Sequence, residues 1–207
     1  MSPRPPDQPL RQSDLHADPV EQFRRWFAAA RKSNPMPEAM TLCTASREAR
    51  PSGRMLLLKG VSVKGFDFYT SYESHKAAEL EENPWAALVF WWIELDRQVR
   101  IEGTVSRLDA AASDEYFATR PLGAQIGAIA SRQSTPLKDR RTLEDAVERV
   151  AAQHPAGTSP ERPAHWGGYR VAPQAFEFWQ GRHDRLHDRF RYSRSEDRSW
   201  DIERLQP

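Results

Sequence analysis

The longest apolar stretch of the chain, residues 85–93, places the strongest constraint on its fold. It reads Trp-Ala-Ala-Leu-Val-Phe-Trp-Trp-Ile, with Asn83-Pro84 before it and Leu95-Asp96 after it. A helix that crosses a bilayer needs about 20 apolar residues, so this stretch is far too short to span a membrane. A short apolar run between turn residues is typical of a strand inside a sheet. We therefore expect a strand that is buried on both faces.

Segments with strand-like and helix-like periodicity surround this run. The expected strands are residues 39–46, 54–62, 66–71, 85–93, 97–108, 168–172, 175–180, 186–192 and 200–205. The expected helices are residues 19–33, 75–82, 109–119, 123–132 and 138–153. Strands, then helices, then strands with short connections indicate an α+β fold on an antiparallel sheet. A small closed or split barrel would remove exposed sheet edges, and the alternatives are an open sheet with helices on one face and a sandwich.

The first 17 residues differ in composition from the rest of the chain. They are polar and contain Pro3, Pro5, Pro6 and Pro9, which predicts a flexible, loosely attached arm. Asp18-Pro19 then fits a helix N-cap followed by the first helical position. The whole chain has 207 residues, so we expect residues 18–207 to form a single domain.

Charge and cysteine content exclude several classes of function. The net charge of +1 gives no reason to expect nucleic acid or a membrane surface as a partner. Cys43 is the single cysteine, so there is no internal disulfide, and no Cys/His spacing predicts a metal site. The N-terminus lacks the apolar core of a signal peptide, and the expected location is therefore the cytoplasm.

A row of cations near the C-terminus is a candidate ligand site. If residues 185–192 form a strand, Arg185, His187 and Arg189 share one face, next to Trp179 and with Gly181 allowing a turn. Guanidinium groups bind phosphate and carboxylate oxygens in pairs, so the row suits an anionic ligand. The alternative is a solvated basic edge strand, which discourages pairing between sheets.

A second set of polar residues lies in the first two thirds of the chain. Arg54 and Lys59 bracket an apolar strand, and a charge that enters a buried strand needs a partner. His75-Lys76 follows Ser74 at a helix start, where the helix dipole favours an anion. Further candidates are Gln98 on a polar strand face, the Gln133-Ser134 pair, and Tyr116 with Arg120 on one helix face. Each has an ordinary structural alternative: a capped helix start, an exposed amide or surface packing.

The chain has many anion-binding candidates but little acid–base machinery. No Gly-x-Ser-x-Gly, Walker or dinucleotide-binding glycine motif occurs in the sequence. This combination is expected when a phosphorylated cofactor carries the chemistry and the protein supplies binding and orientation.

Several of these stretches together resemble the pyridoxine (pyridoxamine) 5'-phosphate oxidase family. The segments that carry the resemblance occur in family order at residues 54–59, 68–70, 74–77, 97–99, 116–121, 125–128, 131–134, 178–181 and 185–189. The last two, Phe-Trp-Gln-Gly and Arg-Leu-His-Asp-Arg, are the most specific. The resemblance implies an FMN-binding split-barrel homodimer with FMN at the subunit interface.

The resemblance also implies roles for individual residues. The implied FMN contacts are Arg54, Met55, Leu56, Leu57, Leu58, Lys59, Tyr69, Thr70, His75, Lys76, Gln98, Gln133, Ser134, Trp179 and Arg189. The implied substrate contacts are Lys59, Tyr116, Arg120, Arg185 and His187, with Arg185 and His187 at the reacting carbon. The implied reaction oxidises pyridoxine or pyridoxamine 5'-phosphate to pyridoxal 5'-phosphate, with molecular oxygen as acceptor and hydrogen peroxide as product.

Three departures from the family pattern leave the substrate open. His75 stands where the family usually has Arg, and Ala124 stands where it usually has a Ser that helps to bind substrate phosphate. The N-terminal arm lacks the Arg-x-x-Tyr pattern of some members. The alternatives are a split-barrel FMN oxidase of another substrate, for example in phenazine biosynthesis, and a flavin-binding module without turnover.

Overall fold

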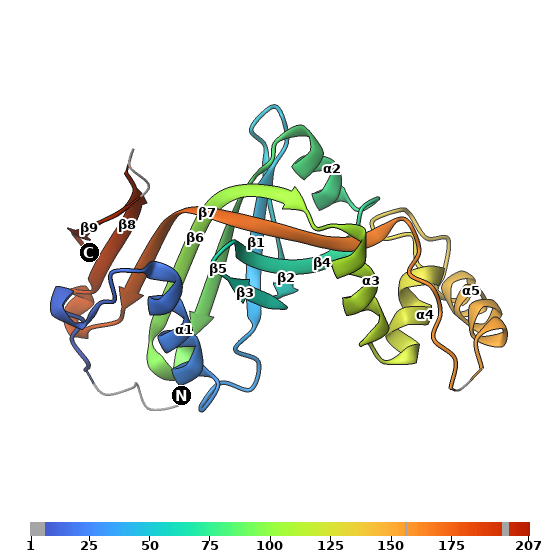
Figure 1. Cartoon of the computed structure of the whole chain (residues 1–207), viewed down its shortest axis with the longest axis horizontal. Helices are drawn as coiled ribbons and strands as arrows, with labels where there is room; N and C mark the ends of the chain where they lie inside the picture. The colour runs from blue at the N-terminus through green and yellow to red at the C-terminus, as the bar shows by residue number, and fades with distance from the viewer. Residues whose placement is uncertain (1–6, 156, 196–198) are drawn as a thin grey trace.

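The computed structural model describes residues 7–155, 157–195 and 199–207, and its strands form one antiparallel sheet (Figure 1). The described strands are β1 (Ala39–Ala45), β2 (Pro51–Leu57), β3 (Gly60–Ser62), β4 (Gly65–Ser71), β5 (Trp85–Trp92), β6 (Arg97–Arg107), β7 (Trp166–Gln180), β8 (Asp188–Arg194) and β9 (Trp200–Leu205). The described α-helices are α1 (Pro19–Ala30), α2 (His75–Glu82), α3 (Ala110–Ala118), α4 (Leu122–Ala130) and α5 (Arg140–Gln153). Short 3-10 helices are η1 (Gln12–Asp14), η2 (Ile93–Leu95) and η3 (His183–Arg185). The predicted α+β class with an antiparallel sheet is confirmed.

The long strand β7 divides the sheet into two branches. The order β2-β1-β5-β6-β7-β4-β3 forms one path, while β8 and β9 pair beyond β7 on a second path. The first half of β7 pairs with β4 up to Val171, and the second half pairs with β8 from Ala175 onward. Between these halves the register against β6 shifts at Glu102/Gly103, which is a β-bulge. A side chain at Gly103 would collide with the backbone of β7, so this close approach requires glycine.

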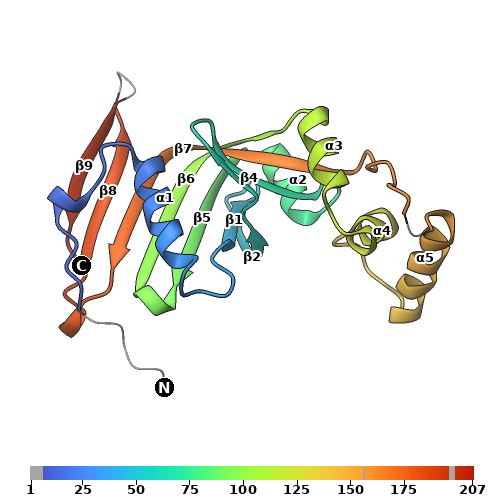
Figure 2. The same cartoon turned by 60° about the horizontal axis from the view of Figure 1, so that its bottom comes forward.

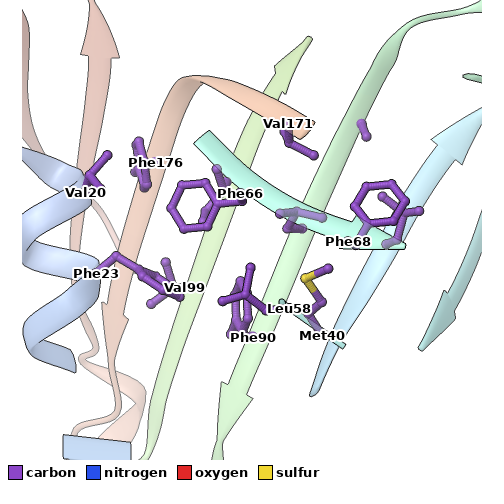
Figure 3. Close-up of a cluster of buried hydrophobic side chains, with 14 of the residues drawn as sticks. Val20, Phe23, Met40, Leu58, Phe66, Phe68, Phe90, Val99, Val171 and Phe176 are labelled. Atoms are coloured by element: carbon purple, nitrogen blue, oxygen red, sulfur yellow. The ribbon is translucent and has the colours of Figure 1, made fainter. Parts of the chain in front are cut away.

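The core lies between the concave face of the sheet and α1. Asp18 caps α1 by accepting a hydrogen bond from the Val20 N–H at 2.8 Å, as the sequence predicts. Phe23 of α1 is fully buried and contacts the rings of Phe66 and Phe90, each at 5.0 Å between centroids. Figure 3 shows these rings among aliphatic side chains from several strands. Their burial fixes α1 across the sheet because aromatic side chains remove large apolar areas from water.

The remaining helices lie toward one end of the sheet. Figures 1 and 2 show α3 beside the end of β7 where that strand begins, with α4 and α5 projecting beyond the sheet. Helix α2 lies near β1 and begins directly after β4. In the described part of the chain, no helix is long and apolar enough to span a membrane.

Several expected element boundaries are wrong. The strand expected over residues 54–62 is two strands, β2 and β3, and the two strands expected over residues 168–180 are one, β7. The strand expected from residue 186 begins at Asp188, after η3. Strand β5 is buried on one face only, since Trp85 and Trp91 are exposed on the other. Burial therefore alternates along the strand, with Ala87 and Val89 half-buried between the two exposed tryptophans.

The N-terminal arm also differs from the expectation from residue 7 onward. Leu10 is buried in the core, and its N–H donates to the Asp188 carboxylate at 3.0 Å. Asp7 pairs with Arg182 at 2.6 Å, and the Tyr192 hydroxyl donates to the His16 carbonyl oxygen at 2.8 Å. These contacts attach the arm to the C-terminal strands, while residues 1–6 lie outside the described part of the chain.

Candidate functional site

The Lys76 ammonium is the central feature of one cluster. Lys76 lies in the first turn of α2, and it is only 6% exposed. Its Nζ donates to Gln133 Oε1 at 2.7 Å and to the hydroxyls of Thr70 and Ser74, each at 3.1 Å. Among the described residues, no carboxylate forms an ion pair with it. Ser74 stands at the N-cap of α2 as predicted, but its hydroxyl binds Lys76 and the Ser71 carbonyl oxygen instead of capping the helix.

Arg54 lies close to this ammonium and is held by a buried carboxylate. Its Nη2 is 3.2 Å from Oε2 of Glu79, which lies one helical turn after Lys76. Nη1 also donates to the Leu42 carbonyl oxygen at 3.2 Å, which fixes the guanidinium at the edge of the sheet. The hydroxyls of Thr44 and Ser52 donate to Glu79 as well. Exposed His75 has its Nε2 3.8 Å from Glu79 Oε1, so it faces the same carboxylate from outside.

Burial and neighbouring charge make the cluster electrostatically unusual. Burial, together with the Arg54 charge, lowers the pKa of Lys76 from 10.5 to about 8. Burial alone would raise the pKa of Glu79, but hydrogen bonds from Ser52 and Thr44 and the nearby cations lower it. Glu79 is therefore ionised and neutralises part of the Arg54 charge, whereas no carboxylate of the described residues forms an ion pair with the Lys76 ammonium. An anion bound beside Lys76 would supply a counter-charge.

A stack of aromatic rings adjoins the Lys76 cluster. The rings of Tyr69 and Tyr116 lie 3.9 Å apart at 17° to each other, and the buried Trp166 ring lies nearly parallel, 5.6 Å from that of Tyr69. The Arg120 guanidinium lies 4.6 Å from the centre of the Trp166 ring. Its Nη1 is buried without a hydrogen-bond partner in the described chain, and burial lowers the Arg120 pKa. Such a donor is suited to an anionic ligand oxygen.

A cavity of about 320 Å³ joins this stack to the Lys76 cluster. Its lining residues are Met55, Leu56, Leu57, Lys59, Tyr69, Thr70, Tyr116, Arg120, Gln133 and Trp166. Nine of the residues predicted for the cofactor or the substrate thus meet around one cavity: Met55, Leu56, Leu57, Lys59, Tyr69, Thr70, Tyr116, Arg120 and Gln133.

Two other residues predicted to contact the cofactor, Leu58 and Ser134, do not line this cavity. Leu58 is buried in the hydrophobic core, which leaves only its backbone for a ligand. Ser134 is exposed and adopts a positive φ of 71°, on the loop that follows α4.

A second cluster surrounds Trp179 near the end of β7. The His187 ring lies 4.4 Å from the Trp179 ring, and Arg189 is the register partner of Trp179 on β8. Gln98 is its partner on β6. Arg189 forms two hydrogen bonds with Glu177, at 2.9 and 3.0 Å, and these raise the Arg189 pKa. The structure therefore brings Gln98, Trp179, His187 and Arg189 together, as predicted.

The predicted cationic row on one strand face is wrong for Arg185. Arg185 ends η3, outside β8, and both Asp184 and Arg185 adopt positive φ angles, of 55° and 61°. The Arg182 backbone N–H donates to His187 Nδ1 at 3.1 Å, so neutral His187 carries its proton on Nε2. Gly181 has no positive φ, and a side chain there would meet the Asp96 carboxylate, which would have to move aside.

The two clusters lie far apart within one chain. Trp166 and Trp179 belong to opposite halves of β7, and 13 residues of extended strand span on the order of 40 Å. Figure 1 shows α3 beside one end of β7 and β8 beside the other. The sequence did not single out Glu79, Trp166 or Arg182, whose partners lie on elements distant in the sequence.

The chain belongs to the pyridoxamine 5'-phosphate oxidase family. Residues 27–154 match the sequence profile of that family, described as pyridoxamine 5'-phosphate oxidase. Residues 166–207 match a profile described as the pyridoxine 5'-phosphate oxidase C-terminal dimerisation region, which supports a homodimer. Family membership confirms the predicted class of enzyme, an FMN-dependent oxidoreductase.

Individual relatives and solved structures agree with this classification. A Paraburkholderia phymatum protein named pyridoxine/pyridoxamine 5'-phosphate oxidase is 52% identical over 196 residues, covering 94% of this chain and 92% of the relative. PhzG from Burkholderia lata, solved with tetrahydrophenazine-1-carboxylic acid, has a TM-score of 0.90 at 31% identity, covering 97% of this chain and 99% of that structure. A pyridoxamine 5'-phosphate oxidase-related, FMN-binding protein from Nostoc punctiforme shares the fold, with a TM-score of 0.73 at 17% identity over 93% of this chain and 100% of that structure.

Proposed function

We propose that this protein oxidises pyridoxine 5'-phosphate or pyridoxamine 5'-phosphate to pyridoxal 5'-phosphate, using FMN and molecular oxygen and producing hydrogen peroxide. The observation that carries the proposal is the buried Lys76 ammonium, which has three neutral acceptors and no carboxylate partner among the described residues. A buried cation without a counter-charge is costly, and a phosphate group would relieve that cost. Arg120 presents a second buried donor in the adjoining cavity.

The residues present fit an FMN molecule. In this proposal Arg54, Thr70, Lys76, Gln133 and Ser134 hold its phosphate, with exposed His75 as a weaker outer cation. Tyr69 and the backbone of residues 55–59 line the same cavity. Gln98, Trp179 and Arg189 contact other parts of the flavin. Residues 18–207 then act as one FMN-binding domain.

The separation of the two clusters supports a site shared by two chains. The Lys76 cluster adjoins the first half of β7 through Thr70, which pairs with Gly167, whereas Trp179 lies in the second half, so one small ligand cannot contact both clusters within one chain. A twofold dimer brings the Lys76 cluster of one protomer to the Trp179 cluster of the other, and forms this combination twice. The dimerisation-region match over residues 166–207, which includes Trp179, supports this arrangement.

Substrate residues follow from the same geometry. Lys59, Tyr116 and Arg120 hold the substrate phosphate, since they line the cavity beside the aromatic stack. Arg185 and His187, from the partner's η3 region in this arrangement, cover the reacting carbon and orient the substrate. Bound FMN would supply the acceptor for the hydride that leaves C4' of the substrate, with oxygen as the final acceptor and hydrogen peroxide as the product. For the amine substrate, water is taken up and ammonia is released.

Anaerobic mixing of the FMN-loaded protein with pyridoxine 5'-phosphate tests the function. The flavin absorbance near its visible maximum should bleach, and admitting air should restore it with formation of pyridoxal 5'-phosphate and peroxide. FMN binding without bleaching, for either phosphorylated substrate, contradicts the proposed reaction. Retained flavin without oxygen consumption would instead identify a binding module.

A second candidate substrate is a reduced phenazine precursor. PhzG, solved with tetrahydrophenazine-1-carboxylic acid, matches this fold with a TM-score of 0.90, and Ala124 replaces the hydroxyl expected for phosphate binding. Bleaching by a tetrahydrophenazine carboxylic acid but not by pyridoxine 5'-phosphate would favour this candidate.

A further inference from the structure

Four side chains form a row across four neighbouring strands on the face of the sheet opposite α1. Trp91 of β5 is the register partner of Gln98 on β6, and Gln98 is the partner of Trp179 on β7. Trp179 is in turn the partner of Arg189 on β8. Residues paired directly across strands point to the same face. Three of the four belong to the proposed flavin site, and Trp91 has no role in it so far.

Trp91 is placed unlike the other aromatic residues of its strand. Its neighbours Phe90 and Trp92 are buried on the core face, whereas Trp91 is 47% exposed. Its ring centroid lies 5.8 Å from that of Trp179, although the two strands are separated by β6. Backbones two strands apart lie about 9–10 Å from each other, so the two rings lean together above Gln98. Trp91 therefore contacts the flavin-site tryptophan directly.

The Trp179 ring is consequently held from two sides. His187 lies 4.4 Å from it on the β8 side, and Trp91 lies on the β5 side. A half-buried tryptophan that lacks one of these neighbours gains rotamer freedom, and binding a ligand must then order it. Ring contacts of this kind also favour one orientation, since tilted and offset aromatic pairs are preferred.

We propose that Trp91 is a positioning residue of the cofactor site, which holds the Trp179 ring in the orientation that receives the flavin. This inference rests on the proposed function. It assigns Trp91 an effect on FMN affinity that passes through Trp179, not a role in the chemical step.

FMN titration of the ligand-free protein, followed by quenching of flavin fluorescence, tests the proposal. Trp91→Ala should weaken FMN binding by about five- to tenfold, the scale of one aromatic pair, and Trp91→Phe should restore most of the affinity. Trp85→Ala is the matched control, because Trp85 lies on the same strand and face, is 50% exposed, and is paired with Thr104 in another row. It should change FMN affinity less than twofold (about the scatter between independent surface sites).

A double-mutant cycle with Trp179→Ala separates positioning from other roles. Trp91→Ala should have little further effect on FMN affinity once Trp179 is absent. Equal effects of Trp91→Ala on FMN affinity in both backgrounds would overturn the proposal. A Trp91→Ala variant that shifts the monomer–dimer balance but binds FMN with unchanged affinity would overturn it as well. If the unmodified protein binds no FMN, the proposed function and this inference both fail. If it binds FMN and Trp91→Ala binds equally well, only this inference fails.

Discussion

Replacing Lys76 with methionine should stabilise the ligand-free protein at pH 7 while weakening FMN binding. The folded environment lowers the Lys76 pKa from 10.5 to about 8. At roughly 1.36 kcal/mol per pKa unit, burying the charged form therefore costs about 3 kcal/mol. Methionine is similar in length to lysine but lacks the Nζ atom. Without Nζ, the Thr70 hydroxyl still donates to Gln133 and the Ser74 hydroxyl still donates to the Ser71 carbonyl oxygen. Allowing about 1 kcal/mol for imperfect packing, the net gain is about 2 kcal/mol.

The pH dependence of this gain distinguishes a buried charge from ordinary packing. Between pH 8 and 10.5 the unfolded chain holds the Lys76 proton more tightly than the folded chain does. The unmodified protein therefore becomes more stable as pH rises through this window. Below the window, it bears the full free-energy cost of burying the protonated Lys76 side chain. Methionine does not titrate, so its advantage should shrink toward zero by about pH 10.

Thermal unfolding of ligand-free protein at equal concentrations measures the effect. At pH 7 the Lys76→Met variant should melt about 4–8 °C higher, given about 2–4 °C per kcal/mol for a chain of this size. Exposed Lys59, replaced by methionine, is the matched control and should show no such pH-dependent difference. In saturating FMN this advantage should shrink by about 1.5–3 kcal/mol, because the variant loses a charge-assisted hydrogen bond to the ligand. A Lys76→Met variant that melts lower at pH 7, or equally higher at pH 7 and pH 10, would refute the reasoning.

Three further predictions concern other parts of the site and fold. FMN affinity of the unmodified protein should fall above about pH 8, where the ligand-free Lys76 loses its proton, and direct titration at pH 7, 8 and 9 should show no such fall in Lys76→Met. Arg185→Ala should lower kcat/KM for pyridoxine 5'-phosphate by about 10- to 150-fold while changing FMN affinity less than about twofold, and equal losses in both would contradict its role at the substrate. Asp188→Asn should destabilise the protein by about 3 kcal/mol, because buried Asp188 accepts from Arg182, Arg204 and the Leu10 N–H. Asp184→Asn, at an exposed position, is the control. Because the folded protein lowers the Asp188 pKa, the difference in melting temperature between the unmodified protein and Asp188→Asn should close only in acid, below about pH 4.

Much of the fold follows from local sequence patterns. Alternating residues over β6 and the apolar run over β5 predict neighbouring strands, and these pair along their whole length from Trp85↔Thr104 to Trp92↔Arg97. Helix starts are equally local: Asp18 and Asp109 cap the helices that follow them. Such features depend on residues within one turn or strand, which a single sequence displays directly.

The features that the sequence did not predict depend on contacts between distant segments. The alternation of residues 185–189 resembles a strand, but Arg182 is anchored by Asp7 and Asp188, and this holds η3 with Arg185 outside the sheet. The bulge in β7 depends on its register against Gly103. Glu79 looks like any helical surface acid until the fold places Arg54 beside it. In each case the deciding partner lies far away in the chain.

The candidate site was predictable by residue type but not by location. The sequence indicates cations and aromatic rings that suit a phosphorylated ligand, and most of them line one cavity. It does not indicate that Trp179, His187 and Arg189 form a separate cluster in the opposite half of β7. The length of that strand separates the two groups within one chain, which agrees with the position of FMN at the subunit interface that the family resemblance implies.

Subunit complementation tests the central claim, that each site combines the Lys76 cluster of one chain with the Trp179 cluster of another. Chains carrying Lys76→Met and Arg185→Ala are produced together with different tags, and hybrid dimers are purified through both tags. In a shared site, one of the two sites of each hybrid receives both changes and the other receives neither. Assayed at an FMN concentration that leaves the Lys76→Met homodimer largely unloaded, the hybrid should therefore show about half the oxidase activity of the unmodified dimer, far above either mutant homodimer. Hybrid activity no greater than the mean of the two mutant homodimers would contradict the shared site.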